Sequence, residues 1–328
     1  MREIRIEDYK KPQISNDLLE ELFKRNWFKS FVPKEFGGLE LELKTASHHI
    51  TEAATHFGGL GWVLNLGGGA NWFSGFFEPE IAKKIFYPSE TVIAGSGAVS
   101  GTFRTKDTKV ILNGKWSKCS GAAHANYFSL NAKNEDTGEV MSFVVPGDSV
   151  KFAEEKWEIL GLKSSSSLTI HLTDVEIPKD FGFQMNTIKN NSDYKVLHIP
   201  FEEFARVCMS SCFIGIALSF LNSLKSDQIF DKNFDTATDL LQKKIARAIL
   251  LRDHFAEKIE EHSNEGKLTN NIKTDLKNKL SKAHLLIFDE IQVLFKNGGV
   301  TLIEENKLSH WAYRDVLTAF QHYFIKPG

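Results

Sequence analysis

Two short polar turns carry the side chains of this 328-residue chain that are best suited to hold a flat, hydrogen-bonding ligand. The first spans residues 119–124 (CSGAAH) and lies between apolar, strand-like runs. The second is the serine run 164–167, which precedes an alternating strand that stops at Pro178. Turns of this kind aim hydroxyl and backbone N–H groups at one point, although a turn serine can also simply bond its own backbone. We treat both turns as candidate binding elements.

A histidine near the C-terminus, His322, is a candidate proton partner, because imidazole gains or loses a proton near neutral pH. Asp315 shares its predicted helix face, but two helical turns separate them, so we expect no direct contact. The alternative is a capping or core histidine at a helix C-terminus, where the helix dipole favours its positive charge. A second histidine, His124, is expected to act as a structural hydrogen-bonding group beside the first turn.

Composition excludes several classes of function. The formal net charge of −2 gives no basic face for nucleic acid. Three cysteines are too few for a disulfide framework, and no Cys-x-x-Cys or His-x-x-x-His set predicts a metal site. Residues 57–77 carry no charge and could span a bilayer by length, but their seven glycines favour a buried helix. With no apolar leader at the N-terminus, we expect a cytoplasmic protein that neither crosses nor binds a membrane.

The elements that would position these residues fall into three regions. Residues 1–90 show helical spacing, with Pro79 placed to open a helix. From Thr91 the period changes to two, and the turn residues 136–138 indicate a hairpin. A polar linker at 186–193 precedes long amphipathic helices, predicted at 201–224, 235–262, 268–295 and 307–324. The chain is therefore expected to be of the α+β class, with domains at 1–90, 91–185 and 186–328.

Five motifs occur in an order that resembles the acyl-CoA dehydrogenase superfamily: FVPKEFGG, NGKW…SGAAHANYF, WEILGLKSSSS, LTDVEIP and NGG…YRD. The second motif is most similar to the flavin-dependent, two-component (group D) monooxygenase branch. The resemblance implies an N-terminal helical domain, a central β-barrel and a C-terminal four-helix bundle. It also implies a homotetramer or dimer, because this fold builds its cofactor site with neighbouring subunits.

The resemblance also implies roles for individual residues. The two turns would bind flavin through Cys119, Ser120, Gly121, Ser165, Ser166 and Ser167. Ser120 and His322 would be the catalytic residues. The substrate would lie between the flavin and the helix that carries Asn71 and Trp72, with His322 as a further contact.

Two departures from the dehydrogenase pattern bear on the chemistry. The acidic residue that removes a proton in most acyl-CoA dehydrogenases is absent from 316–323, and Ala205 precedes Arg206 where other members place it. The family usually holds the adenylate half of FAD with a motif that the segment 220–240 lacks, so the cofactor is expected to be FMN or FAD, possibly supplied reduced and weakly held. These departures favour a reduced-flavin monooxygenase that acts on a small aromatic or heterocyclic substrate, with a separate flavin reductase as partner.

Two alternatives stay open. One is an acyl-CoA dehydrogenase with a relocated base, since a displaced carboxylate could still reach the substrate. The other is a non-catalytic paralogue that binds flavin or a partner. Members of the monooxygenase branch often carry a histidine near the position of Asn71. Its absence from this sequence argues against the monooxygenase hypothesis.

Overall fold

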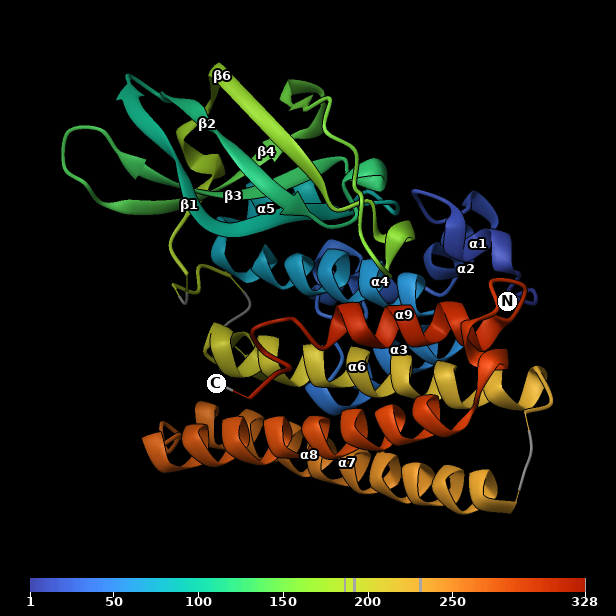
Figure 1. Ribbon diagram of the computed structural model, residues 1–328. Helices are drawn as coiled ribbons and strands as arrows, with labels where there is room; N and C mark the ends of the chain where they lie inside the picture. Colours follow the sequence, from blue (N-terminus) through green and yellow to red (C-terminus); the bar gives the residue numbers. More distant parts are fainter. Residues whose placement is uncertain (186, 191–192, 230–231, 328) are drawn as a thin grey trace.

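The computed structural model places a β-sheet over a layer of helices, with a pair of long helices on the far side (Figure 1). It describes residues 1–185, 187–190, 193–229 and 232–327. The first helices are α1 (Ile6–Lys10), α2 (Asn16–Lys24), α3 (Leu43–His56), α4 (Gly58–Ala70) and α5 (Pro79–Phe86). Pro79 occupies the first turn of α5, as the sequence predicts.

Helix α4 is almost entirely buried, which confirms the buried helix predicted within 57–77. Its glycines permit close helix contacts. A Cβ atom on Gly61 would lie 2.2 Å from the Cβ of Ala54 on α3. A Cβ atom on Gly215 of α6 (Phe201–Ser226) would lie 2.5 Å from the same Ala54 Cβ. Small residues therefore let α3, α4 and α6 pack at short range.

In the part of the chain that the structure describes, seven strands form one mixed sheet in the order β5-β6-β2-β1-β3-β4-β7. They are β1 (Ile93–Lys106), β2 (Lys109–Cys119), β3 (Tyr127–Asn134), β4 (Val140–Pro146), β5 (Lys151–Phe152), β6 (Leu168–Pro178) and β7 (Gly182–Phe183). All neighbours are antiparallel except β1 and β3. Within the described residues the sheet is not a closed barrel, so the predicted central β-barrel is not confirmed. Its two edge strands are two residues long, too short to pair and close it.

The hairpin predicted at 136–138 joins β3 to β4 and is confirmed. Gly138 adopts φ +75°, a conformation that favours glycine. The side chain of Asn134 accepts hydrogen bonds from the backbone N–H groups of Asp136 and Thr137. The turn is thus fixed by local side chain–backbone bonds.

The C-terminal helices are α6 (Phe201–Ser226), α7 (Lys232–Asn264), α8 (Asn270–Asn297) and α9 (Leu308–Ala319). By length and composition α6 could cross a membrane, but 89% of its apolar window is buried, as in the core helix of a globular protein. Helix α9 ends five residues before the predicted end at 324, so His322 lies in a turn beyond the helix.

The change from helices to strands falls at Ile93, and the return to long helices at Phe201. These positions are compatible with the three predicted domains, whose boundaries stay a prediction. Residues 186, 191 and 192 of the predicted linker lie outside the described part of the chain, as do 230 and 231 within the segment 220–240.

Candidate functional site

The structure brings the two predicted turns into direct contact. The backbone N–H of Gly121 donates to the carbonyl of Ser165 at 2.7 Å. The hydroxyls of Ser120 and Ser167 lie 2.6 Å apart, and those of Ser165 and Ser167 lie 2.9 Å apart. We call Ser120, Ser165, Ser166 and Ser167 the serine cluster; all four are buried. Residues 45 positions apart in the sequence therefore form one polar surface.

The neighbouring predicted residues differ in what they offer a ligand. The thiol of Cys119 is fully buried and donates to the carbonyl of Trp116, and burial raises its pKa to about 12. Gly121 adopts φ +80°, which turns its N–H toward Ser165. The hydroxyl of Ser166 is buried with no hydrogen-bond partner. Such a group is costly to leave unsatisfied, so Ser166 is the member of the cluster best placed to gain a ligand contact.

Trp62 on α4 connects the serine cluster to His322. Its indole N–H donates to the hydroxyl of Ser120 at 3.2 Å. Its ring meets the His322 ring edge-on, with the ring centroids 5.6 Å apart. The sequence analysis did not single out Trp62, because a lone tryptophan in an apolar helix has the pattern of a core residue.

His322 is held in a defined state by its own turn. Its Nδ1 atom accepts from the backbone N–H of Phe324 at 3.3 Å. The neutral ring therefore carries its proton on Nε2. Burial lowers the pKa of His322 to about 4, so the imidazole is neutral at pH 7. The group offered to a ligand is an N–H donor and not a cation.

Arg206 on α6 lies beside the same turn. Its guanidinium is 5.1 Å from the centroid of the Phe324 ring and 2.9 Å from the Glu202 carboxylate. The side chain of Arg206 is only 3% exposed. The sequence resemblance drew attention to this arginine, and the structure places its buried guanidinium against Phe324, two positions after His322 in the chain.

Helix α9 anchors the loop that leads into the second turn. Asp315 accepts from the N–H of Leu162 at 2.5 Å, and Thr318 accepts from the N–H of Gly161 at 2.8 Å. Arg314 donates to the carbonyl of Leu160 at 2.7 Å. Arg314 and Asp315 are adjacent opposite charges on α9, and each bonds the backbone of this loop.

Asn71 and Trp72 lie on the short 3-10 helix η3 (Asn71–Phe76), and both are fully buried. The amide of Asn71 donates to the carbonyls of Phe28 and Thr91. The indole N–H of Trp72 donates to the carbonyl of Val196, and its ring stacks on Phe204. The side-chain N–H donors of Asn71 and Trp72 therefore bond backbone carbonyls. A contact between either residue and a substrate stays a prediction.

A cavity of about 660 Å³ lies elsewhere, at the opposite end of α6 from Arg206. Its lining includes Tyr9, His48, Glu52, His56 and Asn222. None of the predicted site residues lines it. The serine cluster, with its converging donors, is the better candidate for chemistry, because a site is defined by the groups it presents and not by volume alone.

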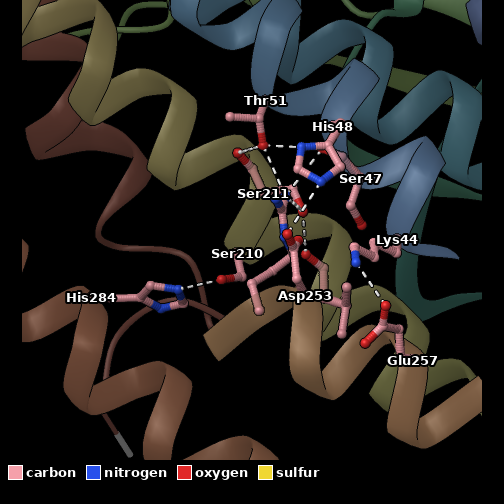
Figure 2. Close-up of polar contacts among 11 residues, drawn as sticks. Lys44, Ser47, His48, Thr51, Ser210, Ser211, Asp253, Glu257 and His284 are labelled. Atoms are coloured by element: carbon pink, nitrogen blue, oxygen red, sulfur yellow. Dashed lines mark hydrogen bonds and ion pairs between the residues drawn. The ribbon is translucent and has the colours of Figure 1, made fainter. Parts of the chain in front are cut away.

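A second buried polar cluster joins α3, α6 and α7 (Figure 2). The fully buried Arg252 donates to the carbonyl of Ser47 and to the hydroxyls of Thr51 and Ser211. Its Nε bonds Asp253, which also contacts His48 at 3.2 Å. We call this set the arginine network. Nearby, His284 bonds Ser210 and the carbonyl of Ile325.

The donors of the serine cluster fit a flavin ring in chemical type. Hydroxyl and N–H groups suit the carbonyl and nitrogen acceptors along the polar edge of an isoalloxazine, and the unpartnered Ser166 hydroxyl leaves one contact to be made. The Ser120 hydroxyl already accepts a hydrogen bond from the indole N–H of Trp62. A ring edge that bonds Ser120 must therefore displace or share this contact.

Comparisons with known proteins agree with the predicted resemblance. No protein-family model matches the chain. The oxygenase subunit HsaA of a flavin-dependent monooxygenase from Rhodococcus jostii is 25% identical over 170 residues, 51% of this chain and 44% of that protein. An indole-3-acetate monooxygenase from Pseudomonas putida is 26% identical over 220 residues, 64% and 54% of the two chains. The chain thus matches about half the length of these curated relatives.

Solved structures show the same fold. A 3-HSA hydroxylase from Rhodococcus sp. RHA1 superposes with a TM-score of 0.87 over 95% of this chain and 86% of the other, at 18% identity. XiaF from Streptomyces sp., in complex with FADH2 and glycerol, gives a TM-score of 0.86 over 98% and 87%, at 16% identity. The predicted resemblance is therefore confirmed: the chain is a homologue of the oxygenase components of flavin-dependent monooxygenases and shares their acyl-CoA dehydrogenase-like fold.

Proposed function

We propose that this protein is the oxygenase component of a reduced-flavin-dependent monooxygenase that acts on a small aromatic or heterocyclic substrate. The observation that carries the proposal is the convergence of the serine cluster, Trp62 and a neutral His322 in a chain homologous to such enzymes. When bound, the reduced flavin, FMN or FAD, supplies the activation of molecular oxygen.

The chain's own residues bind and orient the reactants in this proposal. The hydroxyls of the serine cluster donate hydrogen bonds to the polar edge of the flavin ring. Cys119 and Gly121 contribute backbone groups to the same surface. The Nε2–H of the neutral His322 ring donates a hydrogen bond to the reacting oxygen across the physiological pH range. Asn71 and Trp72 hold the backbone of the helix that borders the substrate space.

Burial of these groups supports the same chemistry. The serine cluster and Trp62 are each less than 10% exposed. Exclusion of water strengthens hydrogen bonds to a developing charge and protects a reactive oxygen species from side reactions. The buried indole ring of Trp62 beside this cluster suits an aromatic substrate better than a charged one.

A separate flavin reductase is proposed as the source of reduced flavin, since one relative is named as an oxygenase subunit. The protein is further proposed to assemble as a homotetramer or dimer and to work in the cytoplasm. The reductase, the oligomeric state and the location are inferred from the similarity to two-component enzymes and not from a surface on this chain.

Binding and turnover test the proposal directly. Anaerobic titration with reduced FMN, and separately with FADH2, should quench the tryptophan fluorescence of the protein, to which Trp62 contributes, as the ring binds. Admission of oxygen with indole-3-acetate or indole as probe should then give a product that carries one added oxygen atom, measured by mass spectrometry. No binding of either reduced flavin would contradict the proposal. Anaerobic bleaching of bound oxidised FAD by an acyl-CoA would point instead to a dehydrogenase.

His322→Leu removes the N–H donor and should lower product formation about 100-fold, the lower range for loss of one hydrogen bond to a developing negative charge. Its binding of reduced flavin should stay close to wild type. His254→Leu is the matched control, because His254 is an exposed histidine on α7. Equal activity of the two variants would rule out a catalytic role for His322.

A further inference from the structure

The loop that ends in the serine cluster has a strained backbone. We call residues 161–167 the serine turn. Leu162 adopts φ +52° and Ser166 adopts φ +40°, both in the left-handed region that residues other than glycine avoid. Such conformations persist only where surrounding contacts hold them, and they gather at ligand-binding sites.

Helix α9 supplies those contacts to the first half of the turn. Asp315 and Thr318 accept from the consecutive N–H groups of Leu162 and Gly161. Gly161 lies so close to α9 that a built Cβ would be 2.1 Å from the carbonyl oxygen of Arg314. Of the two side chains that accept from the turn, only Asp315 can change its charge.

The environment of Asp315 gives its carboxylate little other support. The side chain is 4% exposed, and its second oxygen, Oδ2, is buried without a hydrogen-bond partner. Gly58 on α4 closes the space above it, since a built Cβ there would be 2.7 Å from Oδ2. The bond to Leu162 is therefore the one described hydrogen bond of this carboxylate.

Three other titratable groups face Asp315. Arg314 on its own helix is the cation, and its charge favours the carboxylate form. Burial raises the pKa of Tyr9 on α1 and of Cys212 on α6 well above the ordinary values, and the negative charge of Asp315 raises both further. Both stay neutral between pH 6 and pH 8, so Asp315 itself is the group of this set that can titrate there.

We propose that Asp315 is a positioning residue for the flavin site: its carboxylate fixes the serine turn in the strained conformation that presents Ser165–Ser167 hydroxyls to the ring. The proposal rests on the proposed function. The carboxylate makes a charge-assisted bond to Leu162, which is roughly twice as strong as the bond to a neutral acceptor. Protonation therefore loosens the turn and weakens flavin binding.

The direction of the pH effect follows from the burial of Asp315. Burial raises the pKa of Asp315 from 3.8 to about 7. Flavin affinity should therefore fall as the pH is lowered through 7. Folding stability should respond in the opposite sense. Between pH 4 and 7 the folded state binds a proton that the unfolded state has released, so ionisation of Asp315 removes stability as the pH rises.

Oxidised FMN is the probe, and its dissociation constant is measured by fluorescence at pH 6 and pH 8 for wild type, Asp315→Asn and Thr318→Val. Asparagine keeps an acceptor for Leu162 and cannot ionise. At pH 8 we expect Asp315→Asn to bind FMN about five- to tenfold more weakly than wild type, and at pH 6 about equally. Thr318→Val removes a neutral acceptor from Gly161, so any weakening of FMN binding should be equal at pH 6 and pH 8. The titration of the FMN phosphate is common to all three proteins and cancels in the ratios.

An equal pH dependence in wild type and Asp315→Asn would overturn the proposal while leaving the flavin site intact. If no variant binds oxidised FMN, the titration is repeated anaerobically with reduced FMN and with FADH2. Failure of both contradicts the proposed function, and hydrogen exchange in the flavin-free protein still tests Asp315. After correction for the intrinsic exchange rate, the Leu162 amide of wild type should lose about fivefold in protection from pH 8 to pH 6. The same amide in Asp315→Asn should not change, and a parallel loss in both would overturn the proposal.

Discussion

The serine cluster and the arginine network are both buried polar regions that border the central helices, but they are built from different parts of the chain. The serine cluster comes from turns, carries no charge, and has two strained residues in its loop. The arginine network comes from the faces of three regular helices, and its cation is matched by Asp253 (Figure 2). Strained residues in irregular backbone suggest a ligand site, whereas hydrogen bonds from one guanidinium to two neighbouring helices suggest a structural joint.

The largest effect that separates the two regions is expected for Arg252→Ala. Removal of the guanidinium takes a hydrogen-bond donor from three groups and leaves a cavity between α3, α6 and α7, which should lower the free energy of unfolding by about 3 kcal/mol. Urea denaturation measures this loss. The affinity of the folded protein for reduced FMN should be unchanged. Lys44→Ala, which breaks an exposed ion pair with Glu257, is the control and should cost below about 1 kcal/mol.

Asn71→Leu tests whether a residue predicted to contact substrate belongs with the structural region. The change leaves the carbonyls of Phe28 and Thr91 without their donor, at a cost of about 2 kcal/mol in the free energy of unfolding. If Asn71 serves only the backbone, KM for the aromatic substrate should stay within about twofold of wild type, measured below the unfolding temperature. A tenfold rise in KM at equal kcat would instead assign it to the substrate space.

Ser120→Ala should give the smallest change in stability and a clear change in binding. Ser167 keeps Ser165 as a partner, and Trp62 loses its acceptor, so the free energy of unfolding should fall by about 1 kcal/mol. The dissociation constant for reduced FMN should rise about tenfold, as expected for one hydrogen bond to a buried ring edge. A stability loss as large as that of Arg252→Ala, with no change in binding, would erase the distinction between the two regions.

Much of the fold was accessible from the sequence, because periodicity, Pro79 and the turn at 136–138 are local signals. The meeting of the two turns was expected only through the resemblance, and the structure supplies the bonds, such as Gly121 to Ser165. Trp62 could not be predicted, since its contacts with Ser120 and His322 depend on how α4 docks.

The end of α9 and the partners of Asp315 were also beyond sequence reasoning. Helix propensity extends through 320–324, but the chain turns so that His322 accepts from Phe324 and the Ile325 carbonyl reaches His284. Arg314 and Asp315 are adjacent opposite charges, which suggests a link to other helices. The backbone of 160–162 provides partners that no residue pattern records.

Helix α4 has a consequence for the order in which the molecule assembles. Six of its thirteen residues are glycine, and each costs about 1 kcal/mol of helical propensity relative to alanine. A segment with so little intrinsic tendency to coil into a helix can do so only after α3, α6 and the sheet have come together around it. Trp62 would then reach Ser120 late in folding, and α4 would be the first of the interior helices to fray when its surroundings loosen.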